Sequence, residues 1–102
     1  MYLIQILLPR YDPAGAVFPT DMYRAVIKEL TDRFGGATSY TRALAEGIWH
    51  GDDGRTHHDD VLIVEVMAPS VEAPWWRNYR QRLQRSFRQR ELVVRAHAIQ
   101  LL

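Results

Sequence analysis

The stretch "HHDDVLIVEVM", residues 57–67, decides the fold, because it sets four polar side chains in front of an apolar run. Every residue from 61 to 67 except Glu65 is apolar, and four of them are Val or Ile. A run of this length and composition is typical of a strand that is buried on both faces. Residues 2–8, "YLIQILL", have the same character. The two runs predict the central strands of one sheet.

The segments between and after these runs predict two helices and two further strands. Residues 21–34 carry apolar side chains at helical spacing, with Thr20 or Asp21 as the expected cap and Gly35 at the end. Residues 37–50 have edge-strand composition, and "GDDG" at 51–54 predicts a hairpin turn into the strand at 57–67. Residues 74–90 predict the second helix, and residues 91–102 the fourth strand. The expected apolar faces of the helices are Met22, Val26, Leu30 and Phe34, and Trp76, Tyr79, Leu83 and Phe87.

The resulting order of elements is βαββαβ, which predicts an α+β fold. It is the order of the ferredoxin-like sandwich, a four-stranded antiparallel sheet with two helices on one face. In that topology the first and third strands are central, and here they are also the two most apolar. A chain of 102 residues suffices for one such domain, residues 1–102.

Composition narrows the classes of function. The chain is 47% apolar and 25% charged with a net charge of +1, as in an ordinary globular protein. It has no cysteine, so thiolate catalysis, disulfides and iron–sulfur clusters are excluded. The first apolar run is too short for a signal segment or a membrane span. We therefore expect a cytoplasmic protein that does not contact a membrane.

The polar cluster "HHDD" resembles a metal site only superficially. Because side chains alternate along a strand, His57 and Asp59 lie on one face and His58 and Asp60 on the other. The paired segment offers only Glu46 and His50 as further ligands, in no recognisable zinc or iron spacing. We predict solvated residues at the start of a strand, with no metal and no cofactor.

Arginine is concentrated in the second predicted helix. Arg77, Arg80, Arg85 and Arg88 fall on one sector, which could contact phosphates of nucleic acid or another anionic partner. The near-zero net charge and the absence of interleaved aromatic residues on the last strand argue against nucleic acid. A non-enzymatic interaction module that uses this helix remains the alternative function.

Two tryptophans stand side by side at the start of the same helix. Trp75 and Trp76 diverge by about 100°, so we expect one to pack on the sheet and the other to cover a loop or a partner subunit. Trp76 is therefore also a candidate for binding a ligand.

The sheet face opposite the helices carries the strongest functional signal. If Leu62, Val64 and Val66 face the helices, then Val61, Ile63, Glu65 and Met67 face away. The same alternation turns Leu3, Gln5 and Leu7 outward on the first strand, and Val93, Arg95, His97 and Ile99 on the fourth. An open sheet with so many apolar side chains seldom stays bare to water. We predict a homodimer in which two sheets face each other.

Within this face a polar group forms the candidate site. His97 is the acid/base candidate because the usual pKa of histidine is near neutrality, Glu65 could orient it, and Arg95 could hold a carboxylate or enolate oxygen. Gln5 and Tyr40 are candidate ligand-binding residues, as Trp76 is. The structural alternative is that Glu65 and Arg95 pair with each other and His97 hydrogen-bonds beside them. In that case His97→Ala would destabilise the dimer by roughly 1–3 kcal/mol. The residues alone do not decide between an enzyme and a binder of small organic molecules.

The arrangement also resembles a known group of folds. The segments "RFGG-T", "EGIW", "VLIVEVM", "YRQRL" and "F-Q-ELVVRAH" are similar to those of a family of short, uncharacterised bacterial proteins of the dimeric α+β barrel type. The similarity extends over nearly the whole chain and rests on packing and turn residues. It implies the fold and a dimer. The barrel superfamily includes cofactor-free monooxygenases, haem-degrading proteins, isomerases and ligand sensors, so the resemblance selects no activity.

Overall fold

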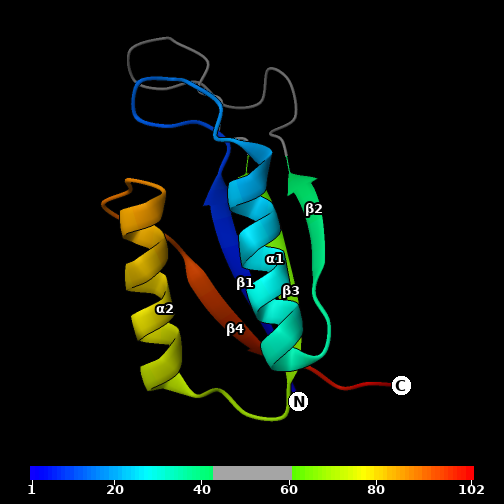
Figure 1. Ribbon diagram of the computed structural model, residues 1–102. Coiled ribbons are helices and arrows are strands. Elements are labelled where there is room, and N and C mark those ends of the chain that lie inside the picture. The colour runs from blue at the N-terminus through cyan, green and yellow to red at the C-terminus, as the bar shows by residue number, and fades with distance from the viewer. Residues whose placement is uncertain (43–60) are drawn as a thin grey trace, which may run out of the picture.

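The computed structural model describes residues 1–42 and 61–102, and contains four strands and two helices in that part of the chain (Figure 1). Their order is βαββαβ, as predicted. The elements are β1 (Tyr2–Pro9), α1 (Thr20–Phe34), β2 (Thr38–Arg42), β3 (Val61–Ala68), α2 (Ala73–Ser86) and β4 (Val94–Ala98).

The strands form one antiparallel sheet in the order β2-β3-β1-β4. β1 lies between β3 and β4, with Gln5 opposite Glu65 on one side and opposite Arg95 on the other. The two most apolar strands are thus the central ones, and the prediction of a ferredoxin-like α+β fold is confirmed.

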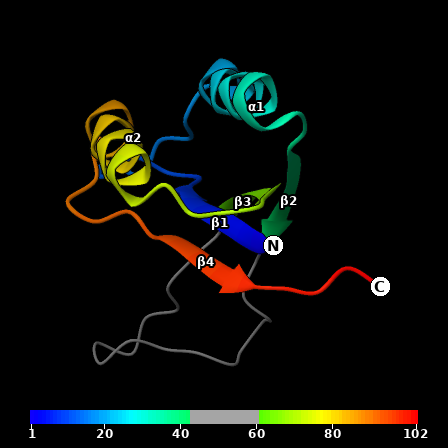
Figure 2. The same cartoon turned by 90° about the horizontal axis from the view of Figure 1, so that it is seen from below.

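Both helices cover the same face of the sheet, as the view along the sheet shows (Figure 2). The core lies between these layers. The even-numbered residues of β1 and β3 point into it and meet buried side chains of both helices, whereas the odd-numbered ones face away. The core consists of Ile4, Ile6, Leu8, Phe18, Tyr23, Val26, Leu30, Val64, Val66, Ala68, Trp76, Tyr79, Leu83, Phe87 and Leu92.

The C-terminal end of α1 matches the prediction, and its N-terminal end does not. Gly35 adopts the left-handed conformation with φ of 82°, and its N–H donates to the Thr31 carbonyl, as expected of a glycine that ends a helix. At the start, neither Thr20 nor Asp21 acts as the cap. Pro19 holds that position in an extended conformation, with no side-chain hydrogen bond, and Asp21 lies inside the first turn. The proline ring sets the backbone there, so the helix begins one residue earlier than expected.

The second helix is shorter than predicted, because α2 ends at Ser86 and Arg88 has a positive φ of 50°. Phe87, the last member of the predicted stripe, is nevertheless buried just beyond the helix. Trp76 packs in the core, as one of the two tryptophans was expected to do. Within the chain, Trp75 stacks on Tyr79 at 5.0 Å, with the Arg33 guanidinium 4.2 Å above its ring; that it also covers a partner subunit stays a prediction.

The outer strands are also shorter than the predicted segments. β2 is an edge strand, as expected, and β4 keeps only the middle of residues 91–102. The hairpin turn at 51–54, the "HHDD" cluster at 57–60, and Glu46 and His50 lie outside the described residues. Within residues 1–42 and 61–102, no helix is long and apolar enough to cross a membrane.

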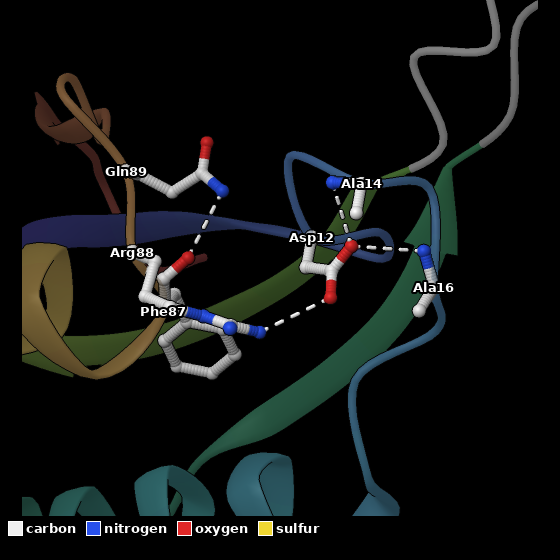
Figure 3. Close-up of polar contacts among 6 residues, drawn as sticks. All are labelled: Asp12, Ala14, Ala16, Phe87, Arg88 and Gln89. Atoms are coloured by element: carbon white, nitrogen blue, oxygen red, sulfur yellow. Dashed lines mark hydrogen bonds and ion pairs between the residues drawn. The ribbon is translucent and has the colours of Figure 1, made fainter.

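The loop between β1 and α1 is tied to the end of α2 by Asp12 (Figure 3). One carboxylate oxygen accepts the backbone N–H groups of Ala14 and Ala16, each at 2.9 Å, and the other accepts from Arg88 at 3.1 Å. The N–H group of Ala16 makes the largest contribution to lowering the pKa of Asp12 below its ordinary value, and Arg88 adds to it. This loop is thereby held against the chain that leads into β4.

Candidate functional site

Gln5 lies at the centre of the candidate site, in the middle of β1 on the face opposite the helices. It is 8% exposed, and among the buried residues of the described chain it is the only amide or charged side chain. A buried amide is stable only when its donors and acceptor find partners. The neighbouring strands supply them, because Glu65 and Arg95 stand opposite Gln5 in the register.

The hydrogen bonds of Gln5 allow only one orientation of its amide. Its Nε2 donates to Glu65 Oε1 at 2.6 Å, and its Oε1 accepts from Arg95 Nε at 2.8 Å. A guanidinium can only donate and an ionised carboxylate can only accept, so a flipped amide would lose both bonds. Gln5 therefore bridges the negative and the positive side chain, which makes their positions interdependent.

The orientation of Gln5 in turn decides which nitrogen of His97 carries a proton. His97 Nε2 lies 3.2 Å from Gln5 Oε1, an acceptor that has no proton to give. His97 must therefore donate from Nε2, and in the neutral ring Nδ1 keeps its lone pair. A base or hydrogen-bond acceptor is thus present at Nδ1. Its orientation comes from Gln5, and the expectation that Glu65 orients His97 directly was wrong, because β1 separates the two strands.

Tyr40, from the edge strand β2, completes the group. Its hydroxyl donates to Glu65 Oε1 at 2.7 Å and accepts a long bond from Gln5 Nε2 at 3.4 Å. The hydrogen bond to Glu65 is the main reason that the pKa of Tyr40 is raised above its ordinary value. Tyr40 therefore stays protonated and serves as a donor.

The five connected side chains, Tyr40, Glu65, Gln5, Arg95 and His97, are called the polar row below. Apolar side chains border this polar row on the same face. Leu3 and Leu7 flank Gln5 and are half-buried, Ile63 is buried, and Met67 is 53% exposed. Beside Glu65 a hollow of about 520 Å³ opens between the end of β3 and the segment that follows α1. Its lining includes Leu3, Glu65 and Met67, together with residues 35–38. The face thus combines a fixed polar row with an apolar border, which is the usual composition of a small-molecule site.

Five of the six predicted site residues thus come together: Gln5, Tyr40, Glu65, Arg95 and His97. Trp76 does not join them. It is 5% exposed and lies in the core on the helix side of the sheet, stacked on Phe34 at 5.3 Å. Any ligand at Trp76 would have to bind somewhere other than at Gln5.

The alternation of side chains correctly predicted that Gln5 lies on the outer face, but it did not identify Gln5 as the residue that contacts the four others. The available signal was a lone amide in the most apolar strand, flanked by Ile4 and Ile6. A polar side chain at the centre of such a strand needs several partners, and the two neighbouring strands each carry a charged residue at the same level.

Of the predicted basic face of α2, Arg88 forms an ion pair, and so do two arginines outside that face. Arg82 forms an ion pair with Glu29 of α1 at 2.8 Å, and Arg88 is held by Asp12 (Figure 3). Arg33 likewise pairs with Glu72 at 2.6 Å, just before α2 begins. Ion pairs that hold elements together thus account for part of the arginine content.

The described residues contain no group of three or more potential ligands that could hold a metal ion. Comparison with protein-family models, with curated proteins and with solved structures gives no match. The resemblance to an uncharacterised bacterial family stays a prediction.

Proposed function

We propose that the outer face of the sheet binds a small organic carboxylate and exchanges a proton with it through His97. The buried Gln5 amide carries this proposal, because it fixes a cation at Arg95 and a proton acceptor at His97 on the same strand. A ligand would meet both groups already oriented, and so would lose less entropy on binding.

The chemistry of the two groups is complementary. Arg95 uses its Nε on Gln5, which leaves the two terminal nitrogens of the guanidinium to face a carboxylate or an enolate oxygen. His97 Nδ1 can accept a proton from a carbon next to a carbonyl group, while the electron pair of that C–H bond moves to the carbonyl oxygen. Arg95 would then stabilise the negative charge on that oxygen.

A second copy of the chain is the cover that we propose for this face. Met67, Val93 and Tyr40 are exposed around the polar row, although large apolar side chains are usually shielded from water. Two sheets packed face to face would enclose the row between them. Sedimentation at micromolar concentration tests this proposal: we expect a dimer, and a single 11.9 kDa species would contradict it.

Phenylpyruvate is a suitable probe, because it has a carboxylate, an apolar ring and exchangeable protons beside a carbonyl. We expect saturable binding by calorimetry, weakened about tenfold or more in Arg95→Gln, the usual effect of losing one charged hydrogen bond. We expect His97→Ala to bind the probe but to lose the protein-dependent exchange of its C3 protons in D2O.

The matched controls are a variant and a ligand. Arg24→Gln removes another exposed arginine, on α1 and away from the sheet, and should bind as the parent does. The methyl ester of phenylpyruvate has no carboxylate and should bind weakly. Equal affinity for acid and ester, or an equal loss in Arg24→Gln, would refute carboxylate recognition by Arg95. Unchanged proton exchange in His97→Ala would refute the role of His97.

A further inference from the structure

Arg80 differs from the other arginines around α2 in one respect: its Nε is buried and has no hydrogen-bond partner within the described part of the chain. A buried donor without a partner is unfavourable, and more so when the group is charged. Such groups are rare in folded proteins and call for an explanation, such as a partner that is not part of the chain.

The surroundings of Arg80 favour an external partner. Arg80 lines a small pocket between α2 and the edge strand β4, with a volume of about 140 Å³. Arg77, one turn earlier on the same helix, lines it too, and no acidic residue does. Like charges three positions apart on a helix repel each other unless something neutralises them. The other walls include Ala73, Trp76, Val94, Arg95 and Ala96.

Carboxylates near this end of α2 are engaged elsewhere. Glu72, which directly precedes the helix, accepts from Arg33 at 2.6 Å. Arg82 and Arg88 each have a carboxylate of their own, Glu29 and Asp12. In contrast to these ion-paired arginines, Arg80 lies in a pocket that offers its guanidinium no acid.

Backbone N–H groups supply further donors around the pocket. Ala73 is the first residue of α2, and the start of a helix carries partial positive charge. β4 is an edge strand, and Val93 bonds to Leu7 of β1 and Ile99 to Met1 just before it. The alternation of the ladder therefore turns the N–H groups of Val94 and Ala96, together with their carbonyl groups, away from β1. Donors from two elements thus border the same pocket.

We infer that the pocket between α2 and β4 binds the phosphate group of a small phosphate monoester, with Arg80 and Arg77 as its ligands. Two guanidinium groups without an acid match the charge of a phosphate monoester, about −1.5 to −2 at neutral pH, better than that of a carboxylate. The pocket is smaller than the roughly 300–1,000 Å³ typical of sites for whole drug-sized ligands, so it fits a head group. Trp76 and the aliphatic side chains offer a surface to the organic part. Arg95 borders both this pocket and the polar row, but Gln5 already holds its Nε, and the inference does not depend on the function proposed for that row.

The test uses phenyl phosphate as the probe and the Arg80 Nε–H resonance as the readout. In the 15N-labelled protein we expect this resonance to shift saturably with phenyl phosphate, and inorganic phosphate to compete for the same site. Arg80→Lys keeps the charge but removes the Nε donor, and should raise the Kd at least tenfold. Arg77→Lys serves as the second variant and should also weaken binding. Arg85→Lys is the matched control, because Arg85 is on the same helix but does not line the pocket.

Three results would overturn the inference. One is the absence of a saturable shift at Arg80 up to tens of millimolar phenyl phosphate. Another is an equal loss of affinity in Arg85→Lys and Arg80→Lys, which would indicate a diffuse basic surface. The third is tight binding of a short single-stranded oligonucleotide that the Arg80 and Arg85 variants weaken alike and that salt abolishes, since this would make α2 a nucleic-acid surface. His97 does not line the pocket, so the proton exchange of phenylpyruvate reports on the proposed function alone, and failure here is distinguishable from failure of that function.

Discussion

Replacing Gln5 by methionine tests whether this side chain organises the polar row. Methionine has a similar length and no strong hydrogen-bonding group, so Gln5→Met removes the four hydrogen bonds to Glu65, Tyr40, Arg95 and His97 with little change of volume. Net contributions of about 0.5–1.5 kcal/mol per bond are usual, and the lower half of this range applies here because Arg95 and His97 are exposed and can bond to water instead. The greater apolar character of methionine offsets part of the loss. We therefore expect the free energy of unfolding to fall by about 2 kcal/mol, which in a domain of this size lowers the Tm by roughly 10 °C.

The assay is thermal and urea unfolding followed by circular dichroism, with Leu7→Met as the matched control. Leu7 lies two residues further along β1 on the same face and is half-buried, but makes no polar contact through its side chain. Exchange of leucine for methionine usually changes stability by less than about 1.5 kcal/mol. Nuclear magnetic resonance should also show loss of the fixed Nε2–H tautomer of His97 in Gln5→Met but not in Leu7→Met. The reasoning would be refuted if Gln5→Met were as stable as Leu7→Met and the His97 tautomer were unchanged.

Four further outcomes are expected. His97→Ala should change the free energy of unfolding by less than about 1 kcal/mol, because the imidazole is exposed and water can replace it at Gln5. A larger loss of stability, measured by urea titration, would favour a purely structural role for His97. Tyr79→Phe should stabilise the protein by about 1 kcal/mol, measured as a rise in Tm, because it removes a buried hydroxyl without a partner in the described chain. Burial raises the pKa of Tyr79, so the unfolded chain loses this phenol proton at a lower pH than the folded protein does. The free energy of unfolding should therefore stay constant below the usual tyrosine pKa of about 10 and fall as the pH rises above it. The fall should be shallower in Tyr79→Phe. Addition of EDTA should leave the Tm unchanged, and a drop reversed by one divalent ion would contradict the prediction that the chain holds no metal.

Much of the fold was predictable because periodicity and turn chemistry act locally. The runs at 2–8 and 61–67 have strand length and β-branched composition, and Gly35 ends α1 through its backbone freedom. The alternation of side chains along β1, β3 and β4 correctly placed Gln5 and Arg95 on one face. These features depend on the nearest residues in the chain, so the sequence determines them directly.

The parts that were missed depend on contacts between distant segments. That Glu65 bonds to Tyr40 and Gln5 rather than to His97 follows from the strand order, which sets β1 between β3 and β4. Trp76 was a reasonable ligand candidate by composition, but the turn of α2 that carries it faces the core. Similarly, the pattern of arginines revealed a basic helix without showing which guanidinium groups already have a carboxylate. Only the packing of α2 against α1 and the Asp12 loop separates Arg82 and Arg88 from Arg80.

The alignment of Gln5, Glu65 and Arg95 at one level of three adjacent strands also bears on how the chain avoids misfolding. Apolar strands alone would pair almost equally well after sliding past one another, because Val, Ile and Leu are nearly interchangeable. If β4 slid by one residue along β1, every side chain would change faces, and the Arg95 guanidinium would enter the core beside Ile4 and Ile6. Burying a charge without a partner is unfavourable by several kcal/mol. The polar row therefore favours the correct strand register during folding, because a shifted register is higher in free energy. This holds whether or not a ligand ever binds to the row.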